Sequence, residues 1–287
     1  MKATFIHFSN FLFYGNVFVS LCAASLTYLN CLLFGVDQFA FHLSLFIFCA
    51  TNVAYNFQRL FRIRKTNSTP SSARLNWIKK HKNHLLLINF LLSGLAFYCL
   101  ILLPMKVLVI LIPIGFISFW YVVDLKSIPA IRSIPFIKLF VIGITWSLST
   151  FGLPLMISNS LYCSKNYAIL FLSITFYVIL QTIPFDIRDI DYDTELKIKT
   201  LAQRLGVKKS KLLSATGFLT LSITFYLISF HELSTQIIVQ SYAISALLAI
   251  PLILAINPHK KEYYYSGVIE SILLFPFLIH LFLSKVF

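Results

Sequence analysis

The feature that most constrains this chain is a series of nine long apolar runs that recur along its whole length. Each run is close to the roughly 20 residues that an α-helix needs to cross the hydrocarbon core of a bilayer. Only 12% of the residues are charged, whereas soluble domains have about 25%. We therefore predict an all-α polytopic membrane protein in which residues 1–287 form a single domain of about nine transmembrane helices around a central cavity. The expected spans are 8–34, 39–57, 84–103, 107–123, 135–157, 167–184, 212–230, 236–256 and 266–283.

The basic residues lie almost entirely on one side of these spans. The net charge is +14, and all but three of the 24 Lys and Arg residues fall in segments that share a side with the N-terminus. Cytoplasmic loops of membrane proteins carry such an excess, so we expect the N-terminus to lie in the cytoplasm. The positive charge is then explained by topology and by attraction to anionic lipid headgroups. No nucleic-acid partner is needed to account for it.

Half of the ten acidic residues of the chain lie between Asp186 and Glu195, directly after the sixth span. If this stretch is helical, Asp186, Asp189 and Asp193 share one face, because they are spaced i, i+3 and i+7. Three carboxylates on one face repel each other unless a cation lies between them. Mg²⁺ takes one or two carboxylates and completes its shell with water and phosphate oxygens. The stretch therefore predicts a Mg²⁺ site, and the alternative is a solvated acidic cap on a membrane helix.

Several basic residues are placed to hold a phosphate group near these aspartates. Arg188 and Lys199 are interleaved with the acidic stretch. Lys126, Arg132 and Lys138 surround two Ile-Pro turns after the fourth span. Arg and Lys side chains form strong, charge-assisted hydrogen bonds with phosphate. The excess of positive charge on cytoplasmic loops would also account for these residues, so both interpretations stay open.

A second polar cluster ends the second span. Asn52, Asn56 and either Arg59 or Leu60 fall on one helix face. Amides in membrane helices usually bond to a neighbouring helix, and the alternative is a weak oxygen-ligand or phosphate-facing site opposite the aspartates. Glu270, inside the ninth span, is a further functional candidate because an intramembrane carboxylate is costly, although a packing role is equally open.

The arrangement resembles the UbiA family of intramembrane prenyltransferases over essentially the whole chain. The second family motif is a D-x-x-x-D-like acidic cluster followed by a K-T-L-A-x-x-L-G tail. It reads here as Asp186-I-R-Asp189-I-D-Y-Asp193, and then as Lys199-T-L-A-Q-R-L-Gly206. This pattern is most similar to the branch of the family that prenylates dihydroxynaphthoate for menaquinone.

The resemblance implies transfer of a polyprenyl group from a polyprenyl diphosphate to an aromatic quinone precursor in a lipid bilayer. It also implies the plasma membrane of a prokaryote and Mg²⁺ as the cofactor, with Asp186, Asp189 and Asp193 as its ligands. The expected substrate-binding residues are Asn52, Asn56, Lys126, Arg132, Arg188 and Lys199.

The first family motif, N-D-x-x-D-x-x-x-D, is degraded in this chain. It reads Asn52-V-A-Y-Asn56-F-Q-R-Leu60. Asn offers an oxygen without the charge, and Leu offers no ligand, so one of the two implied metal sites is weakened or missing. We predict that Arg59 supplies a catalytic positive charge in its place.

Two other classes of protein compete with the enzyme. One is an inactive relative that binds an isoprenoid lipid or a partner protein, and the missing aspartates favour it. The other is a transporter, whose acids would lie near the middle of the membrane and not at one face.

Overall fold

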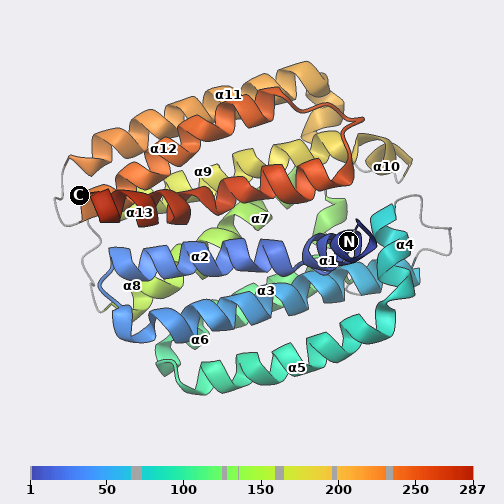
Figure 1. Cartoon of the computed structure of the whole chain (residues 1–287), viewed down its shortest axis with the longest axis horizontal. Helices are drawn as coiled ribbons and strands as arrows, with labels where there is room; N and C mark the ends of the chain where they lie inside the picture. The colour runs from blue at the N-terminus through green and yellow to red at the C-terminus, as the bar shows by residue number, and fades with distance from the viewer. Residues whose placement is uncertain are drawn as a thin grey trace.

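The computed structural model describes residues 2–65, 73–124, 128–134, 136–158, 165–195, 199–230 and 235–286. Nearly all of them are helical (Figure 1). The helices are α1 (Lys2–Tyr14), α2 (Val17–Leu33), α3 (Asp37–Lys65), α4 (Ala73–Lys80), α5 (Lys82–Ile101), α6 (Leu108–Trp120), α7 (Ile137–Ser147), α8 (Leu153–Ile157), α9 (Lys165–Arg188), α10 (Ile190–Glu195), α11 (Leu201–Ser229), α12 (Gln236–Leu254) and α13 (Phe275–Val286). Short 3-10 or π-helical segments join them, namely η1 (Met105–Val107), η2 (Ile131–Ser133), η3 (Leu148–Gly152), η5 (Tyr264–Ile269) and η6 (Glu270–Leu273).

Each apolar run of the sequence corresponds to a helical segment of this architecture. The first and last runs are helix pairs bent by 56° and 51°, and the fourth run is a shorter apolar helix, Met105–Trp120. The other six runs are single helices that are long and apolar enough to cross a membrane, namely Asp37–Ile63, Lys82–Ile101, Ile137–Ile157, Asn166–Arg188, Leu201–Ser229 and Gln236–Leu254. The prediction of an all-α polytopic membrane protein is confirmed, with eight spans among the described residues if each bent pair is one span.

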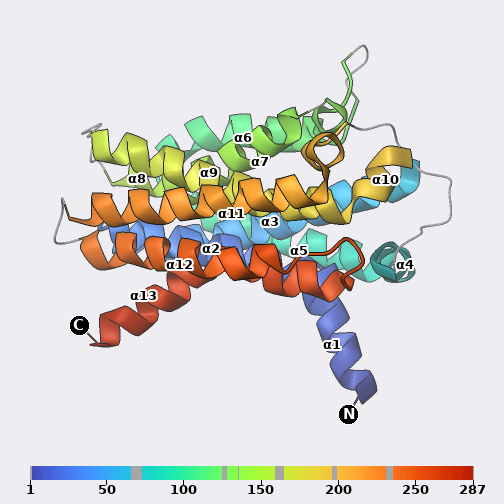
Figure 2. The same cartoon turned by 90° about the horizontal axis from the view of Figure 1, so that it is seen from above.

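The long helices lie roughly parallel and form a bundle (Figure 1). Helix α3 packs between α2 and α5, and α9 packs against both α7 and α11. Figure 2 shows α6, α7 and α8 along one side of the bundle, and α1 and α13 diverging from the opposite side. Helices α4 and α10 lie at the same end of the bundle in both views. That end carries the polar site described below.

The outer surface of the bundle is strongly apolar. On α5, Phe90 and Phe97 are 77% and 65% exposed, and Leu227 on α11 is 58% exposed. Soluble monomers rarely expose so many large apolar side chains together. The hydrocarbon of a bilayer is the environment that these faces require.

The segment that begins at Lys199 in the sequence starts α11. The hydroxyl of Thr200 accepts a hydrogen bond from the backbone N–H of Gln203 at 3.3 Å, and the side chain of Gln203 accepts one from the N–H of Thr200 at 3.0 Å. This capping box satisfies two donors that a helix start leaves free. Gly206 then interrupts α11 with a φ of 77°, a conformation that glycine adopts without strain. The tail of the second motif is therefore explained by helix initiation.

Candidate active site

The acidic segment forms the end of α9 and the whole of α10. A turn at Asp189 separates the two helices, but the N–H of Asp189 donates to the carbonyl of Phe185 at 3.0 Å, and that of Asp193 donates to the carbonyl of Asp189 at 2.8 Å. These bonds keep the chain on a helical path. Asp186, Asp189 and Asp193 consequently line one cavity, as their spacing predicts, whereas Asp191 is exposed.

Lys138, in the first turn of α7, lies between two of the aspartates. Its Nζ is 2.7 Å from Oδ1 of Asp186 and 3.2 Å from Oδ2 of Asp193. Both aspartates are almost completely buried, with 2% and 3% of their surface exposed. Two buried carboxylates this close would repel each other without a cation. The ammonium group of Lys138 supplies that cation.

Asp189 is held by a different cation. Arg188 contacts both of its oxygens, with Nε 2.7 Å from Oδ1 and Nη2 2.9 Å from Oδ2. Burial raises the pKa of Asp189, but the guanidinium of Arg188 outweighs this effect and holds the pKa well below its usual range. Arg188 also donates to Oε1 of Glu262 at 3.2 Å, and the same oxygen is 2.9 Å from Nη1 of Arg74 on α4. This row of ion pairs ties α4 to the acidic segment.

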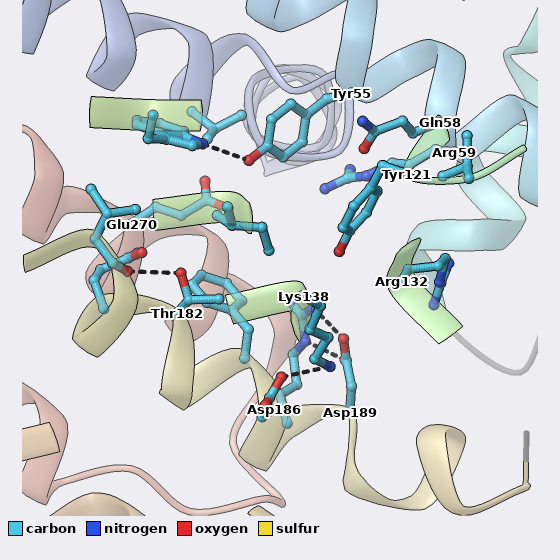
Figure 3. A pocket seen from close by; sticks show the side chains of 18 of the residues that line it. Tyr55, Gln58, Arg59, Tyr121, Arg132, Lys138, Thr182, Asp186, Asp189 and Glu270 are labelled. Atoms are coloured by element: carbon cyan, nitrogen blue, oxygen red, sulfur yellow. Dashed lines mark hydrogen bonds and ion pairs between the residues drawn. The ribbon is translucent and has the colours of Figure 1, made fainter. Parts of the chain in front are cut away.

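These groups line a polar cavity of about 180 Å³ (Figure 3). In Figure 3, Lys138 and Asp186 lie on the opposite side of the cavity from Tyr55 and Arg59. The charged lining consists of six basic and four acidic side chains, namely Arg59, Arg62, Arg74, Arg132, Lys138 and Arg188, with Asp186, Asp189, Asp193 and Glu270. Cations outnumber acids, so the cavity suits a polyanion.

The crowding of positive charge perturbs the cations themselves. Burial, and after it the nearby Arg188, lowers the pKa of Arg74. Burial, and after it the nearby Arg62, lowers the pKa of Arg132. Guanidinium groups nevertheless stay protonated in proteins. A bound anion would relieve this repulsion and accept hydrogen bonds from several donors at once.

A larger apolar chamber of about 580 Å³ adjoins the polar cavity, lined mainly by α3, α6 and α7. The two share Tyr55, Gln58, Tyr121, Ile142 and Trp146. At this junction the indole N–H of Trp146 donates to the hydroxyl of Tyr55 at 3.2 Å. The volume is in the range of small-molecule sites, about 300–1,000 Å³. An elongated molecule can thus place a charged head in the cavity and an apolar tail in the chamber.

The asparagines of the first motif do not line the polar cavity. The helical path is interrupted between α1 and α2 at Gly15 and Asn16, and Asn16 has a φ of 60°. Asn52 and Asn56 donate to the carbonyl of Gly15 at 3.0 and 3.4 Å, and Asn16 donates to Oδ1 of Asn56 at 2.6 Å. The last carbonyls of a helix have no partner within that helix, and unpaired backbone groups are costly in a membrane. Asn52 and Asn56 therefore cap the end of α1.

The next two residues of this motif go to different places. Leu60 is buried in a small cluster with Ile78 and Leu85. Arg59 donates from Nη1 to the carbonyl of Tyr14 at 3.2 Å and also lines the polar cavity, where Figure 3 shows it. Arg59 is therefore the expected site residue of the first motif that the structure brings to the aspartates.

The remaining expected site residues are distributed as follows. Arg132 and Arg188 line the cavity, and Glu270 reaches it from η6. Lys199 is exposed just before α11 and does not line the cavity. Lys126 lies outside the residues that the structure describes.

Two carboxylates of the acidic segment remain suitable for Mg²⁺. Within the described ranges, no three His, Cys, Asp or Glu side chains come close enough together to enclose a metal ion. Mg²⁺ needs only one or two carboxylates, however, when phosphate and water complete its shell. In the described part of the chain, Oδ2 of Asp186 is buried without a hydrogen-bond partner, and Asp189 lines the same cavity. These residues fit one Mg²⁺.

The architecture matches solved structures of UbiA homologues. The homologue from Archaeoglobus fulgidus bound to GPP and Mg²⁺ has a TM-score of 0.67 and 10% identity, and the match covers 96% of this chain and 99% of that one. This chain has the UbiA fold. The apo homologue from Aeropyrum pernix K1 gives a TM-score of 0.64 at 13% identity, covering 94% and 98% of the two chains. Digeranylgeranylglyceryl phosphate synthase gives 0.54 at 17% identity, covering 95% and 96%. No protein-family model and no curated protein sequence matches the chain.

The sequence does not single out three of the residues that line the cavity, namely Gln58, Arg62 and Arg74. Lys138, near the start of the fifth apolar run, is open in the sequence between a phosphate-binding residue and an ordinary lysine, because the excess of positive charge on cytoplasmic loops already explains it. Its one distinguishing signal is a charge inside an apolar run, where charged residues are rare. Gln58 and Arg62 follow Tyr55 at helical spacing, which could have revealed a polar stripe on α3. Arg74 lies far away in the sequence and gave no signal.

Proposed function

We propose that this protein transfers a prenyl group from a prenyl diphosphate to an acceptor in the membrane. The observation that carries the proposal is the junction between a cation-rich cavity and an apolar chamber. A prenyl diphosphate has a polyanionic head and a hydrocarbon tail, so it matches both compartments. Support comes from A. fulgidus UbiA homologues of the same fold that are bound to GPP and Mg²⁺ or to DMAPP and Mg²⁺.

In this proposal the diphosphate lies among the cations of the polar cavity. Arg59, Arg132 and Lys138 approach it from three different segments, so they fix its orientation as well as its charge. Mg²⁺, held by Asp186 and Asp189, would add positive charge at the leaving oxygens. Arg188 holds Asp189 in place through its two-point contact.

The proposed reaction breaks the bond between the allylic carbon and the diphosphate oxygen, and the diphosphate leaves with the electron pair. The rings of Tyr55, Tyr121 and Trp146 lie at the junction where the allylic cation would form. A cation over such a ring gains about 0.5–2 kcal/mol. The acceptor then forms the new bond and loses a proton, and the carboxylate of Glu270 lines the cavity as the group to receive it. From the motif resemblance, the acceptor that we propose is an aromatic quinone precursor.

The charge distribution adds a proposal about orientation. The site lies at the end of the bundle that carries α4 and α10. The loops of this end hold most of the basic residues, so we assign it to the cytoplasm of a prokaryotic cell, with the N-terminus on the same side.

The test of the reaction is release of diphosphate from the protein in lipid nanodiscs. The assay combines geranyl diphosphate, a panel of aromatic, sugar-phosphate and glycerol-phosphate acceptors, and either Mg²⁺ or EDTA. Release that needs Mg²⁺ and is lost in Asp189→Ala would support the enzyme, and the acceptor that accelerates it would identify the second substrate.

An inactive isoprenoid-binding protein is the second candidate. The observation that favours it is the use of Asn52 and Asn56 as caps for α1, which keeps both asparagines out of the cavity. Tight binding of geranyl diphosphate without release, for every acceptor in the panel, would establish this second function and overturn the first.

A further inference from the structure

The contact of Lys138 with two aspartates differs from an ordinary structural ion pair. Its Nζ lies 2.7 Å from Asp186 and 3.2 Å from Asp193, and the three side chains come from α7, α9 and α10. All three also line the polar cavity. The side chain of Lys138 is only 16% exposed. An ammonium group with two carboxylate contacts keeps its third N–H available for an anion in the cavity.

The charge around this contact is unbalanced. One ammonium faces two carboxylates, and Oδ2 of Asp186 is left buried without a partner in the described part of the chain. A buried carboxylate oxygen is costly unless a donor or a metal satisfies it. The oxygen of Asp186 that Lys138 does not contact is therefore the atom that one further cation would stabilise.

A metal ion that bridged Asp186 and Asp193 would lie beside the ammonium of Lys138, which already contacts one oxygen of each aspartate. Mg²⁺ binds carboxylate oxygens at about 2.0–2.1 Å, so it would lie close to this ammonium, and two neighbouring cations repel each other. Because the lysine is part of the chain, it disfavours a metal ion between these two aspartates.

We propose that Lys138 is a built-in cation that takes the place of a divalent metal between Asp186 and Asp193, so that this site binds one Mg²⁺, at Asp186 and Asp189. The proposal rests on the proposed prenyl-diphosphate function. In it, Lys138 holds the two carboxylates together and contacts the diphosphate directly. The site then keeps part of its affinity for the diphosphate when all divalent metal is removed.

The first test counts metal ions. The protein in nanodiscs is titrated with Mn²⁺ in the presence of geranyl thiolodiphosphate, an unreactive analogue, and bound Mn²⁺ is counted by electron paramagnetic resonance. The wild type should bind one Mn²⁺ per chain. Lys138→Met keeps the apolar stem of the side chain but frees both carboxylates, so it should bind two. The control Lys209→Met, at an exposed position of α11, should bind one.

The second test measures binding of the analogue in EDTA by calorimetry. The wild type should bind it without metal, and Lys138→Met should bind it about 10- to 100-fold more weakly, the effect of losing one charge-assisted hydrogen bond. Lys138→Arg keeps the charge, so it should retain both metal-free binding and the count of one Mn²⁺. This variant guards against misfolding as the cause of the Met result.

Two Mn²⁺ ions in the wild type, or unchanged metal-free binding in Lys138→Met, would overturn the inference. The outcome is separable from that of the proposed function. Counts of one and two Mn²⁺ with no diphosphate release would support the built-in cation and refute the enzyme. Diphosphate release with two Mn²⁺ in the wild type would do the reverse.

Discussion

Two segments of this protein occupy corresponding places in the UbiA motif pattern but have separate roles in the structure. Residues 52–60 of α3 turn their asparagines to the broken end of α1, where Asn52 and Asn56 bond to the carbonyl of Gly15. Residues 186–193 turn Asp186, Asp189 and Asp193 into the cavity, where each of the three contacts a basic side chain. The first segment holds helices together, and the second forms one wall of the site.

The difference separates a segment without acids from a segment whose acids are paired with fixed cations. Metal ligands are missing from the first segment, but fixed cations surround the second. Arg59 and Lys138 approach the cavity from opposite sides (Figure 3). A fixed cation cannot dissociate, so it stabilises an anion at any concentration of metal.

The largest effect is expected in the acidic segment, because the proposal places the loss of diphosphate at its carboxylates. Asp186→Asn keeps the shape of the side chain but removes the charge that positions Lys138 and that would hold Mg²⁺. We expect diphosphate release to fall about 10²- to 10³-fold, the loss typical of one preorganised electrostatic contact. The control is Asp191→Asn, the exposed acid of the same segment, which should keep wild-type release. Release within tenfold of wild type in Asp186→Asn would contradict the assignment.

A variant of Arg59 tests whether residues 52–60 contribute positive charge to the diphosphate site and no metal ligands. Arg59→Met should abolish turnover and weaken binding of geranyl thiolodiphosphate about 10- to 100-fold, because one charge-assisted contact is lost. Mn²⁺ should still bind at the aspartates, since no metal ligand is removed. Arg59→Lys should recover part of the affinity. Full activity of Arg59→Met would refute the role of this arginine.

An acid introduced into residues 52–60 tests whether this segment is structural or can still bind a metal ion. Asn56 is 1% exposed and surrounded by other amides and by a backbone carbonyl. Asn56→Asp therefore buries a carboxylate without a cation, which should cost about 3 kcal/mol or more and lower the Tm by roughly 5 °C or more. Thermal unfolding followed by tryptophan fluorescence measures the shift, with Asn83→Asp at an exposed position as the control. A gain of one bound Mn²⁺ in Asn56→Asp would show instead that this segment can still serve as a metal site.

The smallest effect is expected at Glu262, which links the acidic segment to α4. Glu262→Gln removes the charge that Arg74 and Arg188 share. Because Glu262 does not line the polar cavity, its charge acts on a bound anion only from a distance, and binding of the diphosphate analogue should change by no more than about fivefold. Calorimetry on Glu262→Gln and wild type measures it. A loss as large as that of Asp186→Asn would mean that Glu262 belongs to the binding site itself.

Much of the fold follows from local sequence. Runs of apolar residues specify membrane helices wherever they occur, because the backbone of each helix satisfies its own hydrogen bonds. For that reason all nine runs correspond to helical segments, including the bent first and last ones. The helical period likewise predicted that Asp186, Asp189 and Asp193 would share a face, and all three line the cavity.

The tertiary structure decided what those faces meet. Asn52 and Asn56 have the spacing of a ligand pair. Their partner, however, is the carbonyl of Gly15, which lies just after α1 and far away in the sequence. The sequence leaves the role of Lys138 open between membrane topology and phosphate binding, and only the packing of α7 on α9 brings its Nζ between two carboxylates. Helical period is a local property that the sequence states directly. The partner of a polar side chain is set by contacts between distant segments, and only the packed bundle determines them.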